Sequence, residues 1–341
     1  MFKKTFFQIH WFLGITAGLI LSIMGVTGAI YSYEPQILKW MNSDSYTVQV
    51  QERDKLSPAQ LYQHFQNQNP EMKINSITVA QDPSASSTVN IVKEGARRGY
   101  NMMVNPYTAE VLPEIKGREF FQFVQQLHRN LTVGPVGKQI TGACTLMLIF
   151  FVLSGLYLRW PKRHSIKQWL AVKPQLKGRN FIWDLHAVVG TWVVIFYLIL
   201  ACTGLTWSYG WWRDGMYKVL GVERPQPEMQ ANGGRGEGSE RGPRGERGQR
   251  GEGREEAGMS PESISRALDQ SWAGFSTQFA GKYSTVTFNL PKKPDGEMQL
   301  SFVDPVAQHE RARNNATYNY RSAEFTEVQL YEDKKLNEKI M

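Results

Sequence analysis

Three long stretches of the chain contain no charged residue and are dominated by apolar side chains. They run from about Trp11 to Tyr33, from about Gln139 to Leu158, and from Ala187 to Trp212. At a helical rise of about 1.5 Å per residue, roughly 20 such residues cross a hydrocarbon core about 30 Å thick. The pattern therefore predicts three membrane-spanning helices. The first run is longer than the core of a signal peptide and no A-x-A site follows it, which favours a retained anchor over a cleaved leader.

Between and after these runs, the pattern changes to short alternating segments that follow a capped helix. Ser57-Pro58 and Ser260-Pro261 each place a capping Ser before a Pro at the first helical position. Period-two alternation then predicts strands. We therefore expect two small α+β modules outside the bilayer, with strands at Ile74–Val79, Thr88–Val92, Gly99–Val104, Ser284–Leu290 and Gln299–Val303.

The two halves of the chain follow one register. His10 precedes Thr27-Gly28 by 17 and 18 residues, and His186 precedes Thr203-Gly204 by the same offsets. Helix and module together repeat, which indicates an internal duplication. Because the first half has a second helix after its module, we expect a fourth span just beyond Met341. That span would carry a histidine matching His128.

The expected fold class is a membrane α-helical protein with two small periplasmic α+β modules. A cytoplasmic N-terminus, three spans, their connecting segments and a polar linker divide the chain. The boundaries are 1–10 (N-terminus), 11–34 (helix 1), 35–136 (module 1), 137–159 (helix 2), 160–182 (basic cytoplasmic loop), 183–212 (helix 3), 213–230 (periplasmic connector), 231–258 (linker) and 259–341 (module 2).

Charge sets the expected orientation. Lys3 and Lys4 precede the first span, and the segment between Arg159 and Arg179 carries seven basic residues and no acidic one. Short loops rich in Lys and Arg stay in the cytoplasm, so we place the N-terminus and this loop inside. These nine charges exceed the net charge of +8, so the basic balance reflects topology and not nucleic-acid binding.

The segment 231–258 is rich in Gly and balances six Arg against six Glu. Such a composition cannot form a core, and its G-x-y triplets are too few for a collagen helix. We interpret it as a disordered periplasmic linker. An arginine-glycine tail for nucleic acid is the alternative, and the neutralising glutamates argue against it.

His10 and His186 begin two helices that run in the same direction, so both lie at the same depth near the cytoplasmic face. Two imidazoles from two helices can bind one metal between them. Gly14, Gly18 and Gly190 lie one or two turns above them, where missing side chains leave room for a flat macrocycle. Zinc requires three or four ligands, and no such cluster is near. We therefore predict haem b with His10 and His186 as axial ligands.

His128 lies just before the second span, at the outer face, and would hold a second haem if the fourth helix supplied its partner. Gly28 and Gly204, 18 residues above the paired histidines, would make room for it. Arg129 would pair with a propionate. Simpler readings stay open: a histidine at a helix start is often only interfacial, and Gly14-x3-Gly18 is also a helix-packing pattern. No side chain is predicted to be catalytic.

The sequence resembles the PepSY-associated transmembrane proteins of bacterial inner membranes, which include siderophore-linked ferric reductases. The shared motifs are His10-Trp11-x2-Gly14 with Val26-Thr27-Gly28, Gln126-Leu127-His128, Ser154-Gly155-Leu156-Tyr157-Leu158-Arg159-Trp160-Pro161, and Asp184-Leu185-His186-x3-Gly190 with Thr203-Gly204. The resemblance implies a four-helix core, two periplasmic PepSY modules, b-type haem on membrane histidines and a role in iron acquisition.

These observations predict an inner-membrane haem protein that passes electrons outward to a ferric siderophore or another periplasmic Fe(III) complex. The donor is a separate cytoplasmic molecule or a quinol, because the sequence has no G-x-G-x-x-G or other nucleotide fingerprint. Two alternatives stay open. One is a quinol-linked cytochrome b subunit of a larger complex, and the other is a membrane-anchored PepSY module that binds a peptide or protein without redox chemistry.

Overall fold

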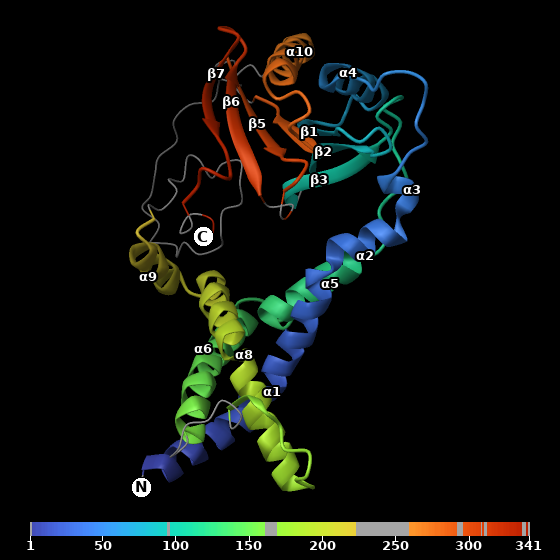
Figure 1. The fold of residues 1–341 in the computed structure, drawn as a ribbon. Helices are drawn as coiled ribbons and strands as arrows, with labels where there is room; N and C mark the ends of the chain where they lie inside the picture. The colour runs from blue at the N-terminus through green and yellow to red at the C-terminus, as the bar shows by residue number, and fades with distance from the viewer. Residues whose placement is uncertain are drawn as a thin grey trace, which may run out of the picture. The chain divides into compact units, whose positions relative to one another are not determined.

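The computed structural model describes residues 2–93, 96–160, 169–222, 259–291, 296–307, 309, 312–335 and 339. The chain divides into two compact units, shown in Figure 1. One unit comprises Met1–Gln36 and Gly117–Ser239, and the other comprises Ile37–Lys116 and Glu240–Met341. The linker predicted at 231–258 and the central part of the basic loop, 161–168, lie outside the described residues.

Three helices of the first unit are long and apolar enough to cross a membrane. They are α1 (Phe2–Ser32), α6 (Gly134–Arg159) and α8 (Arg179–Ser208). Helix α6 packs against both of the others. Large apolar side chains such as Trp11, Ile15 and Phe196 are exposed on these helices, as expected for surfaces that face lipid. The predicted spans are confirmed, and α1 and α8 begin several residues before the uncharged runs do.

Two further helices extend this unit. Helix α5 (Arg118–Asn130) precedes α6, and α9 (Gly210–Leu220) follows α8 where a connector was expected. The chain reverses between α5 and α6 through Leu131 and Thr132, both with positive φ. Gly137 permits this reversal, because a Cβ there would lie 1.7 Å from the Asn130 carbonyl oxygen.

The second unit is built on one antiparallel sheet of seven strands, in the order β3-β2-β1-β4-β5-β6-β7. The predicted strands are found, together with β6 and β7, which the alternation did not reveal. Short helices α2 and α3 lead into this unit. The bounds are α2 Glu34–Met41, α3 Ser43–Tyr46, β1 Ile74–Ala80, β2 Ser87–Lys93, β3 Ala96–Val104, β4 Thr285–Asn289, β5 Glu297–Val303, β6 Arg313–Asn319 and β7 Glu324–Gln329.

Two helices cover one face of the sheet, α4 (Pro58–Gln68) and α10 (Pro261–Gln278). Both predicted caps are confirmed: Ser57 forms a capping box with Gln60, and Ser260 accepts a hydrogen bond from the backbone N–H of Ser263. The two helices also contact each other, with Gln63 Nε2 donating to Ser265 Oγ over 2.7 Å.

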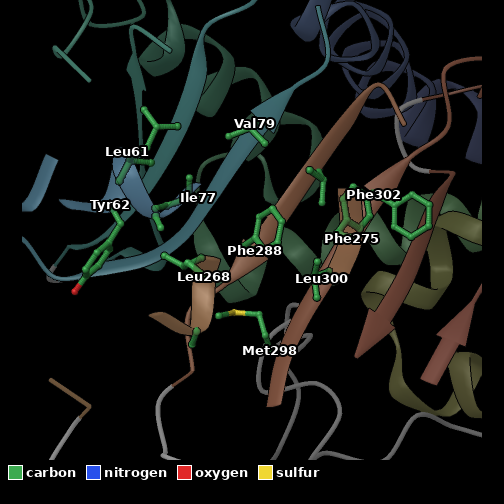
Figure 2. Close-up of a cluster of buried hydrophobic side chains, with 14 of the residues drawn as sticks. Leu61, Tyr62, Ile77, Val79, Leu268, Phe275, Phe288, Met298, Leu300 and Phe302 are labelled. Carbon is green, nitrogen blue, oxygen red and sulfur yellow. The ribbon is translucent and has the colours of Figure 1, made fainter. Parts of the chain in front are cut away.

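The two predicted modules share a single core. Strand β1 of the first half pairs with β4 of the second, and Thr78 lies opposite Thr287 at the centre of the ladder. Figure 2 shows buried side chains of both halves in one cluster. It includes Leu61, Ile77 and Val79 from the first half and Leu268, Phe275, Phe288, Met298, Leu300 and Phe302 from the second.

Candidate functional site

The structure brings His10 and His186 together within the membrane unit. His10 lies on α1 and His186 on α8, and their ring centroids are 6.4 Å apart with the planes inclined at 80°. Phe151 of α6 lies against the His10 ring, 5.4 Å between centroids. His10 is half-buried, whereas His186 is exposed. Two residues separated by most of the membrane unit's sequence thus form one histidine pair at the ends of two spanning helices.

A hydrogen bond from α6 orients His10. The Nδ1 atom of His10 lies 2.8 Å from Ser154 Oγ, and that hydroxyl in turn donates to the Phe150 carbonyl over 2.6 Å. A hydroxyl has only one proton to donate, so with that proton on the carbonyl its oxygen accepts from Nδ1–H. The Nε2 atom of His10 then keeps its lone pair. This tautomer allows metal binding through Nε2.

The glycines predicted beside the pair have open space next to them. A Cβ built on Gly14, Gly18, Gly190 or Gly204 would meet no heavy atom within 4 Å among the described residues. Among the described residues, no neighbouring helix therefore packs closely against Gly14 or Gly18. The faces of α1 and α8 beside the histidines are accessible to lipid or to a flat ligand.

His128 sits on α5 and contacts α1. Its ring lies against Gly28, where a Cβ would be 2.9 Å from the His128 Cε1 atom. The Nδ1 atom of His128 is 2.8 Å from the Met24 carbonyl oxygen and 3.3 Å from Thr27 Oγ1. A carbonyl only accepts, so Nδ1 carries the proton and Nε2 is left as a potential ligand. Gly28, expected to make room for a haem, here makes room for the imidazole itself.

Arg129 follows His128 and reaches toward α8. Its guanidinium carbon lies 5.2 Å from the centroid of the Trp207 ring, a cation–π contact. The predicted propionate contact of Arg129 stays a prediction. Within the described residues, no group of three or more His, Cys, Asp or Glu side chains is arranged to hold a metal ion. The histidine pair and His128 are therefore the residues to consider as ligands.

Sequence reasoning assigned no role to the groups that orient these histidines. Ser154 lies near the end of an uncharged run, where its polarity was a signal of a specific partner. Thr27 stood in the duplicated register, and its hydroxyl now lies beside His128. The Met24 carbonyl could not have been found from side-chain patterns, because a backbone group carries no sequence signal.

Comparison with protein families gives the class of the protein. The family model described as the PepSY-associated TM region matches residues 7–334. The chain belongs to this family. A search of curated proteins returned no match. The PepSY-associated match begins within α1 and ends after β7, so it includes the histidine pair, His128 and both halves of the sheet. The resemblance inferred from the motifs is thereby confirmed.

Proposed function

We propose that this PepSY-associated membrane protein holds b-type haem in its spanning helices and passes electrons outward to ferric iron bound by a siderophore. The observation that supports this proposal is the distance between the two rings of the histidine pair. Imidazole nitrogens bind a metal at about 2 Å, so two rings on opposite sides of one ion have their centres about 6 Å apart. The 6.4 Å between the His10 and His186 centroids fits that requirement.

The side chains around the pair have defined tasks in this proposal. His10 and His186 hold the group, and Ser154 keeps the Nδ1 proton of His10 in place so that Nε2 faces the ligand site. The open positions at Gly14, Gly18 and Gly190 leave the helix surfaces free for a flat macrocycle. Haem with two histidine ligands supplies one-electron transfer, because no position on the iron is left for oxygen or substrate.

His128 is the candidate ligand of a second haem. The Met24 carbonyl fixes its ring in the same tautomer as that of His10, with Nε2 available. A second imidazole would be needed to complete this site. Arg129 and its Trp207 contact lie beside it, and a guanidinium there would also suit a carboxylate.

Orientation and substrate follow from charge and from iron chemistry. Because short basic segments favour the cytoplasmic side, the proposal has the histidine pair near the cytoplasmic face of an inner membrane and the sheet unit in the periplasm. Siderophores hold Fe(III) with hard oxygen ligands, and Fe(II) matches those ligands less well. Reduction of the periplasmic ferric complex would therefore release the iron for uptake.

The visible spectrum of the detergent-purified protein, oxidised and dithionite-reduced, tests the proposal together with a haem count. We expect the wild type to show a low-spin b-type spectrum. The intensity of this spectrum and the haem count should both be lower in His10→Ala and in His186→Ala. His64→Ala is the matched control, because His64 is an exposed residue of α4 in the other unit. A protein that stays colourless after haem supplementation would refute the haem assignment. Reduction of a ferric siderophore by the isolated protein would separate a reductase from a quinol-linked cytochrome b subunit.

A binding function without redox chemistry is the second candidate, and strand β7 favours it. This strand is at the edge of the sheet and almost all of its residues are exposed. An exposed edge can accept an extended peptide as an additional strand. This candidate expects a colourless protein whose β7 amides become protected from hydrogen exchange when a periplasmic peptide binds.

A further inference from the structure

A cavity of about 400 Å³ opens where α6 ends and α8 begins. Its described lining combines two indoles with groups of both charges, from Arg159, Trp169, Lys173, Asn180, Trp183 and Asp184. The volume lies in the range of small-molecule sites, which are typically concave and carry a few placed polar groups. Two of these residues, Arg159 and Asp184, belong to the sequence motifs yet have no task in the histidine site.

The cavity wall is held in place by hydrogen bonds. Arg159 donates through Nη1 to Thr191 Oγ1 and through Nη2 to the Trp169 carbonyl, over 3.0 and 2.9 Å. Asp184 Oδ2 accepts from the backbone N–H of Lys173 over 2.8 Å. The end of α6, the segment around Trp169 to Lys173 and the start of α8 are thus tied to one another. A cavity built this way is preorganised.

The cavity adjoins the histidine pair along α8. Ala187, which also lines it, is the next residue after His186, and Trp183 lies about one helical turn before that histidine. The Trp183 ring also contacts Phe7 of α1, with 5.6 Å between centroids. A molecule in the cavity would therefore lie within a short distance of the pair that is proposed to hold haem.

We propose that this cavity binds the head group of a membrane quinone or quinol. Both indoles line the cavity, and because Arg159 lies over the Trp169 ring, 5.8 Å from its centroid, Trp183 is the ring that a flat aromatic partner would contact. Arg159 and Lys173 supply donors for ring carbonyl oxygens, whereas the Asp184 carboxylate and the Asn180 amide oxygen accept from ring hydroxyls. A site with both kinds of partner suits a ring that exists in a carbonyl form and a hydroxyl form.

Location and charge favour a quinone over other ligands. The cavity lies at the ends of two spanning helices, where a lipid-soluble ring reaches the membrane surface. Arg159 and Lys173 would also suit a phosphate, whereas the Asp184 carboxylate and the indoles are partners that a phosphate does not use. The role of the bound quinol as electron donor rests on the proposed function. Binding of the quinone ring in the cavity does not depend on that function.

Photolabelling of the full-length protein with an azidoquinone, followed by peptide mapping, tests the inference. We expect saturable labelling of peptides that contain Trp169 or Trp183, which excess decylubiquinone displaces. Asp184→Asn keeps the shape of the side chain, and Trp183→Leu removes one indole. For each variant, the concentration of decylubiquinone that displaces half of the label should rise about tenfold, as expected for the loss of one good contact. Lys177→Gln, an exposed position of the same loop outside the lining, should leave it unchanged.

The same labelling on the His10→Ala/His186→Ala double variant separates this inference from the haem proposal. Labelling that persists in a haem-free protein supports the cavity as a quinone site even if the wild type proves colourless. Three outcomes would overturn the inference. They are labelling distributed along the spanning helices, labelling that neither Asp184→Asn nor Trp183→Leu changes, and labelling that phosphatidylglycerol displaces but decylubiquinone does not. A haem-containing wild type without saturable labelling would also overturn it and leave the haem proposal intact.

Discussion

Two histidines in different parts of the membrane unit are oriented in the same chemical way. Ser154 Oγ accepts the Nδ1 proton of His10, and the Met24 carbonyl accepts that of His128. Metal-binding histidines usually give their second ring proton to such an acceptor, which fixes both tautomer and ring direction. The arrangement leaves Nε2 of each ring unprotonated, which is compatible with metal binding through that atom, and it is open to direct test.

Ser154→Ala removes the acceptor of the His10 Nδ1 proton. Loss of such a partner typically lowers metal affinity about tenfold to a hundredfold, so we expect haem retention during dilution to fall by a similar factor. Haem titration followed by absorbance measures it. Ser22→Ala is the matched control, because Ser22 Oγ only donates to the Gly18 carbonyl of its own helix. Equal affinities for the two variants would contradict the orienting role of Ser154.

Gly28→Ala places a methyl group 2.9 Å from the His128 ring and should displace it. We expect a lower midpoint of thermal unfolding in detergent, since neither α1 nor α5 can move without losing packing. Gly25→Ala, three residues earlier on the same helix, meets nothing within 4 Å and should gain up to about 1 kcal/mol from helix propensity. A Gly28 variant as stable as the Gly25 variant would show that the ring moves freely.

At the scale of elements, the joint between β1 and β4 makes the sheet unit continuous. Val79 lies opposite Val286 and Ile77 opposite Phe288 across this joint. All four side chains are buried in the shared cluster. Neither half therefore has a core of its own, and we expect both to unfold together.

Phe288→Ala tests this continuity. Phe288 is fully buried, and such a truncation costs about 3–5 kcal/mol. Hydrogen exchange should accelerate in β1 and β2 of the first half as well as in β4 and β5. Val328→Ala, on the exposed strand β7, should leave exchange in β1 unchanged. Acceleration confined to the second half would mean that the two halves unfold independently.

The elements also show what the sequence could and could not predict. Uncharged runs identified α1, α6 and α8, and the Ser-Pro pairs identified α4 and α10, because these signals are local. The pairing of Thr78 with Thr287 was not predictable, since the register between strands so distant in sequence depends on the assembled core. Strand β7 was missed because it is mostly exposed and lacks a buried alternating face.

In the candidate site, too, some features could be predicted from the sequence and others could not. Duplicated register predicted that His10 and His186 come together, and the structure places their rings 6.4 Å apart. It did not predict Ser154 as the partner of His10, because Ser154 lies on α6, outside the segments whose repeat was used. The contact of His128 with Gly28 was not predictable either, because it depends on how α5 packs against α1 in the folded protein.

At the scale of the whole molecule, the distribution of charge predicts which side of the membrane each unit occupies. In a background with Cys144 and Cys202 replaced by serine, Ser322→Cys should react with a membrane-impermeant maleimide added to spheroplasts. Lys173→Cys should react only after permeabilisation. Both positions are exposed, so access to the reagent decides the result. The reverse labelling pattern would invert the proposed direction of electron flow.

The pairing of β1 with β4 bears on how the chain arose. Strands β1 and β4, the first strand of each half, meet antiparallel, with Thr78 opposite Thr287. A contact between like surfaces in this arrangement has local two-fold symmetry, which is the geometry of a homodimer interface. A half-chain that paired with a second copy of itself through this strand would form the same joint. One polypeptide thus contains, as an internal joint, the kind of contact that otherwise joins two subunits.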